Sequence, residues 1–327
     1  MVRNFFYIFS IISALSLQNI WTQTCCSGGV PLTGNVGLPV TEGRAVQFSI
    51  GYDYNVLTDL MFEKSELDDD SRFRSTKSFL LQTGYAFNKY LSISALFSYV
   101  NQRREITQFN NINNTETSGM GDAVILGNYR LHNLIGNDNE LQLFAGPKLP
   151  VGETDKTNED GRLIIADLQP GTSAWDMIYG GGFLQQITFR PSATFYMRFI
   201  HRLTGTNSSY LGNQDYKFGN ELQVFSGLSD QFTTGRTIIE GSLGINYRHA
   251  NKDIINGNVL ANTGGDFVYG LGSLGVYILR NLTVNVSVQL PLYNKPVGTQ
   301  LVPSYRWNIG MLFTLPMKNN SLKINTL

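Results

Sequence analysis

Twelve stretches of alternating apolar and polar residues run from about Arg44 to Pro316, and the gaps between them alternate between long and short. The gaps span roughly 19, 2, 16, 6, 22, 3, 11, 7, 15, 3 and 10 residues. A bacterial outer-membrane barrel has this rhythm, because its outer loops are long, its periplasmic turns are short and its strand number is even. The sequence therefore predicts an all-β fold, a transmembrane antiparallel up-and-down β-barrel of about 12 strands, within a range of 12–14.

The first stretch shows why these strands are predicted to span a membrane. It is roughly fourteen residues long, whereas a strand of a soluble sandwich has about five or six and a tilted membrane strand needs about nine to eleven. One of its faces is apolar and the other carries small or polar residues, as expected for lipid on one side and a water-filled lumen on the other. The outward face is Val46, Phe48, Ile50, Tyr52, Tyr54 and Val56, and the inward face is Gln47, Ser49, Gly51, Asp53 and Asn55.

Later stretches repeat this alternation. Phe218, Leu222 and Val224 are predicted to face lipid, and the last strand places Trp307 and Ile309 outward with Arg306 inward. In the glycine-rich stretches around 179–183 and 269–277, the sequence does not decide which alternate residues face lipid and which face the lumen. Tyrosine and tryptophan collect near strand ends, which indicates two aromatic girdles at the membrane interfaces.

The composition agrees with a barrel and excludes other classes. Lysine plus arginine and aspartate plus glutamate both number 25, so no charge excess points to nucleic acid as a partner. Mean hydropathy is −0.11. This value suits a chain in which only every second strand residue faces lipid. After residue 21 no apolar run approaches the roughly 18 residues of a spanning helix.

The N-terminus resembles an export signal in its charge and length. Arg3 gives a positive start, an apolar run follows to Leu17, and residues 18–24 are polar, which predicts a signal peptide over 1–24. The expected remainder is a periplasmic segment at 25–43, the barrel at 44–316 and a tail at 317–327. Cys25 and Cys26 leave three interpretations open: lipidation of Cys25, an exposed thiol pair, or a weak metal or redox site.

Charged residues on the inward faces are the candidates for solute contact. The first and last strands must meet to close a barrel, so Asp53 and Arg306 are predicted to approach each other. Arg198 and Glu221, on neighbouring strands, are predicted to form a second pair. Each charge either braces the wall through a paired partner or takes part in solute selection. The full set of lumen and substrate-contact candidates is Asp53, Lys148, Trp175, Asp176, Arg198, Glu221, Arg248 and Arg306.

Several short motifs carry a resemblance to a known family. GMGD begins at Gly119, GPKLPVGE at Gly146 and LQPGTSAWD at Leu168. These motifs resemble the outer-membrane family of putative meta-pathway phenol degradation proteins, and the TCCSGGVPL segment is similar to predicted transporters of the Bacteroidetes type. The resemblance implies a Gram-negative outer-membrane barrel that moves small, often hydrophobic, molecules. Locally, the glycines indicate close backbone approach, and Pro147 and Pro150 indicate interrupted strand pairing.

The third outer loop, Val151 to Thr172, is the longest and contains the apolar patch Leu163–Ala166 among acidic residues. An exposed apolar patch usually becomes covered, so the loop either folds inward as a constriction beside Trp175 and Asp176 or packs over the rim with neighbouring loops. We expect a porin-like channel in the cell outer membrane for passive uptake of small molecules of hydrophobic or aromatic character.

Two other functions remain open. One is a structural or surface-interaction barrel, whose partner sites would be the acidic first loop and Asn110–Asn114. The other is an outer-membrane hydrolase using His201 with Ser208 or Ser209, although no G-x-S-x-G elbow is present. We therefore expect no enzyme, no catalytic residues, no cofactor and no metal. The expected partners are outer-membrane lipid, a small-molecule solute and the barrel assembly machinery.

Overall fold

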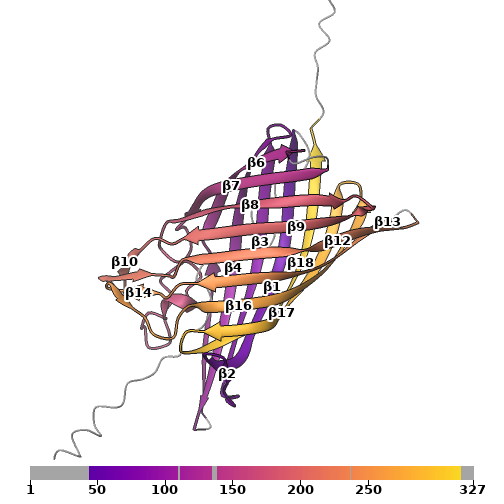
Figure 1. Ribbon diagram of the computed structural model, residues 1–327. Helices are drawn as coiled ribbons and strands as arrows, with labels where there is room; N and C mark the ends of the chain where they lie inside the picture. Colours follow the sequence, from indigo (N-terminus) through magenta and orange to yellow (C-terminus); the bar gives the residue numbers. More distant parts are fainter. Residues whose placement is uncertain (1–43, 110, 135–137, 236, 318–327) are drawn as a thin grey trace, which may run out of the picture.

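The computed structural model describes residues 44–109, 111–134, 138–235 and 237–317. Within them, long antiparallel strands form one sheet that closes on itself because β18 pairs with β1. In Figure 1 the strands of the near wall cross those of the far wall, as expected for strands tilted to a barrel axis. The wall consists of β1 (Ala45–Phe62), β3 (Arg72–Ala86), β4 (Leu91–Gln108), β6 (Ala123–His132), β7 (Asn139–Leu149), β8 (Asp176–Ile187), β9 (Arg190–Leu203), β12 (Glu221–Thr234), β13 (Thr237–Ala250), β16 (Gly265–Leu279), β17 (Leu282–Pro296) and β18 (Thr299–Pro316).

The predicted fold class is confirmed. The wall has twelve strands, all antiparallel to their neighbours, in up-and-down order. No helix in the described part of the chain is long and apolar enough to cross a bilayer. The predicted signal peptide, Cys25, Cys26 and most of the tail lie outside the described residues.

The connections between wall strands differ at the two ends of the barrel. At one end they run over 63–71, 109–122, 150–175, 204–220 and 251–264, while at the other end they are short. By the rule for bacterial barrels, the end with the long connections faces outside. The predicted ten-residue gap before the last strand is wrong, because β17 and β18 extend until only Val297 and Gly298 separate them.

The long connections contain small elements of their own. β5 (Asn111–Met120) pairs with the outer half of β4, so β3, β4 and β5 continue the wall beyond the point where β4 pairs with β6. A separate sheet at the outer end joins two connections in the order β10-β11-β14-β15, and Figure 1 shows β10 and β14 at the same end of the barrel. The remaining elements are β2 (Ser65–Glu66), η1 (Ala166–Leu168), β10 (Asn207–Tyr210), β11 (Gln214–Lys217), β14 (Ile254–Ile255) and β15 (Asn258–Val259).

Alternation decides which side chains face lipid, and one predicted outward residue, Phe218, proves wrong. Val56 pairs with Tyr305 and so keeps its outward register, although its side chain is buried; the register shifts in β1 at Val56/Leu57 and Leu57/Asp59 change the phase only beyond it. Phe218 precedes β12 and packs with Tyr210 and Tyr216 in the outer connections. Most other outward apolar residues, such as Phe79 and Leu243, are exposed on the barrel surface, as lipid-facing residues must be.

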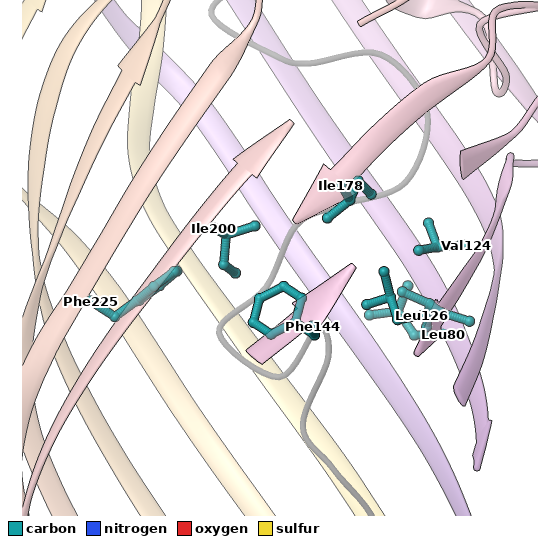
Figure 2. Close-up of a cluster of buried hydrophobic side chains, with 8 residues drawn as sticks. Leu80, Val124, Leu126, Phe144, Ile178, Ile200 and Phe225 are labelled. Atoms are coloured by element: carbon teal, nitrogen blue, oxygen red, sulfur yellow. The ribbon is translucent and has the colours of Figure 1, made fainter. Parts of the chain in front are cut away.

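The inner face is less polar than predicted. A belt of apolar side chains, which we call the apolar belt, crosses it from β3 to β12 (Figure 2). The sequence hid this feature because inward Val124 and Leu126 flank outward Ile125, and the three together read as one continuous apolar run. The expectation of a wholly hydrophilic lining is therefore wrong. The apolar belt consists of Leu80, Leu96, Val124, Leu126, Phe144, Ile178, Ile200 and Phe225, with Leu271 packed against it.

Candidate functional site

A cavity of about 480 Å³ lies inside the barrel. Small polar side chains of β13, β16 and β17 form one side of it, among them Ser242, Ser273 and Ser287. Phe225 of the apolar belt, on β12, and Arg198 and Tyr196, on β9, line the same space. The cavity therefore presents both an apolar edge and hydrogen-bonding groups to any small molecule that enters.

Asp53 and Arg306 line the cavity where the first and last strands meet. Arg306 Nε donates to Asp53 Oδ2 at 2.8 Å and to Oδ1 at 3.1 Å. The predicted approach of these two residues is confirmed. Because Asp53 is almost fully buried and Arg306 is partly exposed, the ion pair braces the closing seam while one edge of the guanidinium borders the lumen.

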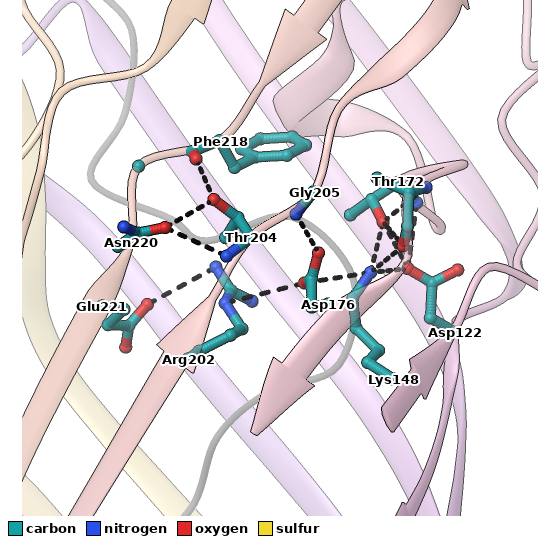
Figure 3. A network of polar contacts seen from close by, with 12 residues as sticks. Asp122, Lys148, Thr172, Asp176, Arg202, Thr204, Gly205, Phe218, Asn220 and Glu221 are labelled. Atoms are coloured by element: carbon teal, nitrogen blue, oxygen red, sulfur yellow. Dashed lines mark hydrogen bonds and ion pairs between the residues drawn. The ribbon is translucent and has the colours of Figure 1, made fainter. Parts of the chain in front are cut away.

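Lys148 is the centre of a buried charged network on the outer side of the apolar belt (Figure 3). Its ammonium donates to Asp122 at 2.5 Å, to the carbonyl of Ala174 at 3.1 Å and to the hydroxyl of Thr172. Asp176 lies 3.2 Å from the same nitrogen. All three donors of the Lys148 ammonium are thus engaged by protein groups, which favours the wall-bracing alternative.

Glu221 continues this network, but with partners other than the predicted one. Its carboxylate accepts from Arg248 Nε at 2.9 Å and lies 3.7 Å from Arg202. Strand register places Arg202 opposite Glu221, whereas Arg198 lies opposite Phe225. The predicted Arg198–Glu221 pair is therefore wrong, because Glu221 begins β12 and the long connection before it hid the register.

Arg198 instead contacts a residue of the apolar belt. Its guanidinium stacks over the ring of Phe144 at 5.0 Å, a cation–π arrangement. Gly180 makes room for that ring, since a side chain there would collide with Phe144. Similarly, Gly227 and Gly244 leave space for the Tyr196 hydroxyl against the wall. Arg198 and Tyr196 thus both border the cavity, with Phe144 stacked against the guanidinium of Arg198.

The third outer loop, residues 150–175, folds against the inner face of the outer wall. Arg74 Nη1 donates to Asp167 Oδ2 at 2.7 Å, and Arg74 Nη2 donates to the Asp167 carbonyl at 2.5 Å. Gln102 and Thr117 donate to the carbonyls of the next two loop residues. The loop is thus fastened to β3, β4 and β5 from within the barrel mouth.

Two glycines of the motifs that carry the family resemblance, Gly152 and Gly171, bring the two ends of this loop close together. The backbones of Gly152 and Gly171 touch, so a side chain at either position would collide with the other residue. Asp122 bonds to both ends, accepting from the amides of Gly152 at 3.0 Å and Thr172 at 3.1 Å. The close approach predicted for such glycines is found here and at Gly121, where an added Cβ would lie 2.3 Å from Ser98 Oγ.

The apolar patch of the loop is covered by neighbouring connections. Ala166 packs with Tyr210, Tyr216 and Phe218, and its amide donates to the Tyr210 hydroxyl at 3.3 Å. Leu163 packs against the same cluster, together with Ile255 and Leu260. The predicted packing of the apolar patch against neighbouring loops is therefore confirmed, while Asp167 is directed to the inner wall. A constriction beside Trp175 and Asp176 stays a prediction.

The remaining predicted residues separate into two groups. Asp176 and Arg248 are buried in the charged network and do not line the cavity. Trp175 is 63 % exposed although its neighbour Asp176 is buried, and its contact with a solute stays a prediction. Sequence reasoning missed Arg74, Arg202 and Asp167. Strand alternation places both arginines on inward faces and could have identified them as candidates. The position of Asp167 depends on the path of a loop, which alternation does not predict.

The hydrolase residues are engaged elsewhere. His201 Nδ1 bonds to the Tyr179 hydroxyl at 2.8 Å on the outer surface of the barrel. The hydroxyl of Ser209 donates to Asn207 at 3.1 Å within the outer connections. Across the residues that the structure describes, no group of three or more histidine, cysteine, aspartate or glutamate side chains is placed to hold a metal ion.

Comparison with known proteins defines the fold but not a family. No protein-family model matches the chain, and no curated protein matches its sequence. An outer membrane channel from Pseudomonas putida F1 superposes with a TM-score of 0.65 at 12% identity, covering 88% of this chain and 100% of that chain. The resemblance to phenol degradation proteins therefore stays a prediction.

Two further solved structures are more distant. A FadL homologue from Pseudomonas aeruginosa gives a TM-score of 0.41 at 10% identity, covering 91% of this chain and 99% of that one. The CymD monoaromatic hydrocarbon channel gives 0.40 at 8% identity, covering 85% and 90%. These two scores are too low to carry an argument. The fold, with its apolar exterior and its likeness to the Pseudomonas putida channel, is that of an outer-membrane β-barrel.

Proposed function

We propose that this protein is a passive outer-membrane channel for small molecules of hydrophobic or aromatic character, with the third outer loop as its gate. The observation that carries the proposal is the cavity of about 480 Å³ inside a closed barrel, bordered by the apolar belt. Clefts that bind small organic molecules are largely apolar with a few convergent polar groups, and this cavity has that composition.

The apolar belt supports the choice of solute. Phe225 and Leu271 border the cavity, and Arg198 adds a cation stacked on an aromatic ring at the same level. A solute crossing the belt loses water on its apolar surface, which favours a hydrophobic solute by roughly 25 cal/mol per Å² buried. A strongly hydrated solute lacks this gain, so the belt should select against it.

The third outer loop supports the gating part of the proposal. It occupies the mouth from the charged network to the outer connections, with Asp167 fastened to Arg74. Passive flow from outside to the cavity requires this loop to shift, and no cofactor or energy source is needed for such a shift. Hydrophobic contacts of Ile164 and Ala166 keep the loop closed.

The transport proposal is tested by liposome flux of phenol and glycerol, two small solutes of opposite polarity. The parent protein should pass phenol faster than glycerol, and Phe225→Asn should lower the ratio of the two rates because it removes an apolar side chain at the cavity edge. Comparing rates within one variant cancels differences in protein insertion. A parent barrel that passes neither solute would overturn the channel proposal.

The gate is tested with two charged substitutions in the same loop. Ile164→Asp places a carboxylate in a buried position and should release the loop, raising single-channel conductance, since an unpaired buried charge is costly. Val151→Asp is the matched control because Val151 is exposed, and it should conduct like the parent. Equal conductance of the two variants would contradict the gating role.

A surface-interaction barrel without transport is the second candidate. The hairpin formed by β4 and β5 projects past the rest of the wall, and Phe109 and Ile112 near its tip are strongly exposed. Exposed apolar residues at a loop tip are typical of contact surfaces. A lumen that seals in every flux and conductance measurement would favour this candidate.

A further inference from the structure

Two arginines face each other at the mouth of the barrel. Arg74 on β3 and Arg104 on β4 are direct partners in the strand register. Both occupy inward positions, because the neighbouring Arg103 is exposed and pairs with Glu105 along its own strand. Arg74 is fully buried and Arg104 is partly exposed. Like charges directly opposite each other repel, so this arrangement needs an anion nearby.

Among the residues that the structure describes, one carboxylate serves these two guanidinium groups. Asp167 of the third outer loop forms its ion pair with Arg74 at 2.7 Å. Arg104 feels the attraction of Asp167 and the repulsion of Arg74, yet it forms no hydrogen bond or ion pair of its own within the described parts of the chain. The buried Arg74 Nε likewise has no acceptor among the described residues. The group of three carries a net positive charge.

We propose that Arg104, together with Arg74, binds the carboxylate of an incoming solute at the channel mouth. The guanidinium group presents a planar fork of donors that matches a carboxylate, and Asp167 shows that a carboxylate fits beside Arg74. Because both arginines face inward, the site meets molecules entering the barrel rather than lipid outside it. A solute that binds at the two arginines and then crosses the apolar belt deeper in the barrel needs both a carboxylate and an apolar ring. The arginine site and the belt together therefore select small aromatic carboxylates.

This site also gives the solute a way to act on the gate. A carboxylate bound at Arg104 competes with Asp167 for Arg74, and the Arg74–Asp167 contact fastens the third outer loop to β3. The inference deepens the proposed function and rests on it for the route beyond the mouth. Binding at the arginines themselves does not require an open channel, so the two can be tested separately.

The experiment measures benzoate binding to the purified barrel in detergent by calorimetry, with benzyl alcohol as the neutral analogue. The parent should bind benzoate, and Arg104→Gln should weaken its affinity about tenfold or more, as expected for the loss of a hydrogen bond to a charged group. Arg103→Gln is the matched control, one residue away on the outer face, and should bind benzoate like the parent. Benzyl alcohol should show no difference among the three proteins.

A second measurement needs no substitution and so does not depend on the folding of a variant. Benzoate should protect Arg104 of the parent barrel from modification by phenylglyoxal, located by mass spectrometry of the digested chain. Unchanged benzoate affinity in Arg104→Gln, an equal loss in Arg103→Gln, or an unprotected Arg104 would each overturn the site. Benzoate binding without phenol flux would overturn the channel and leave the site standing, whereas flux without benzoate binding would do the reverse.

Discussion

Two sides of the barrel interior differ in the size of the side chains that they carry. From β3 to β12 the inner face bears the large residues of the apolar belt and the charged network, packed against each other. From β13 to β17 the periplasmic half of the inner face bears Ser242, Ser273 and Ser287, and the cavity lies against them. The small side chains leave room for the cavity on this side, where the β13–β16 pairing runs without a register shift.

Filling the small-residue side should have the largest effect. Ser273→Trp places an indole in the cavity of about 480 Å³ and should remove most of the conductance, because the opposite side is already filled. Leu274→Trp is the control, since that side chain faces lipid. Single-channel recordings and phenol flux measure both. If the two variants conduct equally, the small serines do not define the path.

Removing the centre of the charged network should have the next largest effect, this time on stability. Lys148→Met leaves Asp122 and Asp176 buried without their ammonium partner, which should lower the free energy of unfolding by about 3–5 kcal/mol. On the other side of the barrel, Ser242→Ala loses the hydroxyl contact with Ser273 at 2.6 Å and the contact with Tyr196, and should cost about 1 kcal/mol. Guanidinium unfolding in lipid vesicles measures both variants, and similar losses would contradict the contrast between the two sides.

The charged network and the seam also show what the sequence could and could not predict. Closure of a barrel forces the first and last strands together, so the approach of Asp53 and Arg306 followed from the strand pattern alone. Glu221 begins β12 directly after the connection 204–220. The path of that connection sets the register of β12, and the alternation of apolar and polar residues does not reveal it. The partners of Glu221, Arg202 and Arg248, were therefore not predicted. Asp167 contacts Arg74 from a loop, and a loop has no sequence periodicity from which its path could be predicted.

The Asp53–Arg306 ion pair, where the first and last strands join, should contribute an intermediate amount to the free energy of unfolding. Arg306→Gln leaves the almost fully buried Asp53 without its guanidinium and should cost about 1.5–3 kcal/mol of unfolding free energy. Arg190→Gln removes an exposed ion pair with Asp230 and should change the unfolding free energy much less, because solvent screens the pair. The same guanidinium titration compares them. A larger loss at Arg190 would mean that burial does not decide the value of these pairs.

The smallest effect concerns the outer connections that cover both sides of the barrel. The carboxylate of Asp253 accepts from the Tyr216 hydroxyl and the Gly219 amide, both at 2.7 Å, and burial raises the pKa of Asp253 above its ordinary value of 3.8. A carboxyl whose folded pKa is raised adds stability that is complete below its unfolded pKa and is lost as the pH rises through its folded pKa.

The loop cluster around Tyr216 should therefore open more readily at pH 7 than at pH 4. Hydrogen exchange of β11 and β14, corrected for the intrinsic rate at each pH, measures this opening. Asp253→Asn keeps the shape without the titration and should flatten the pH dependence, while Asp215→Asn, at an exposed position on β11, should leave it as in the parent. Because the cluster contacts the third outer loop through Ala166, a pH-independent parent would also remove this route by which pH could reach the proposed gate.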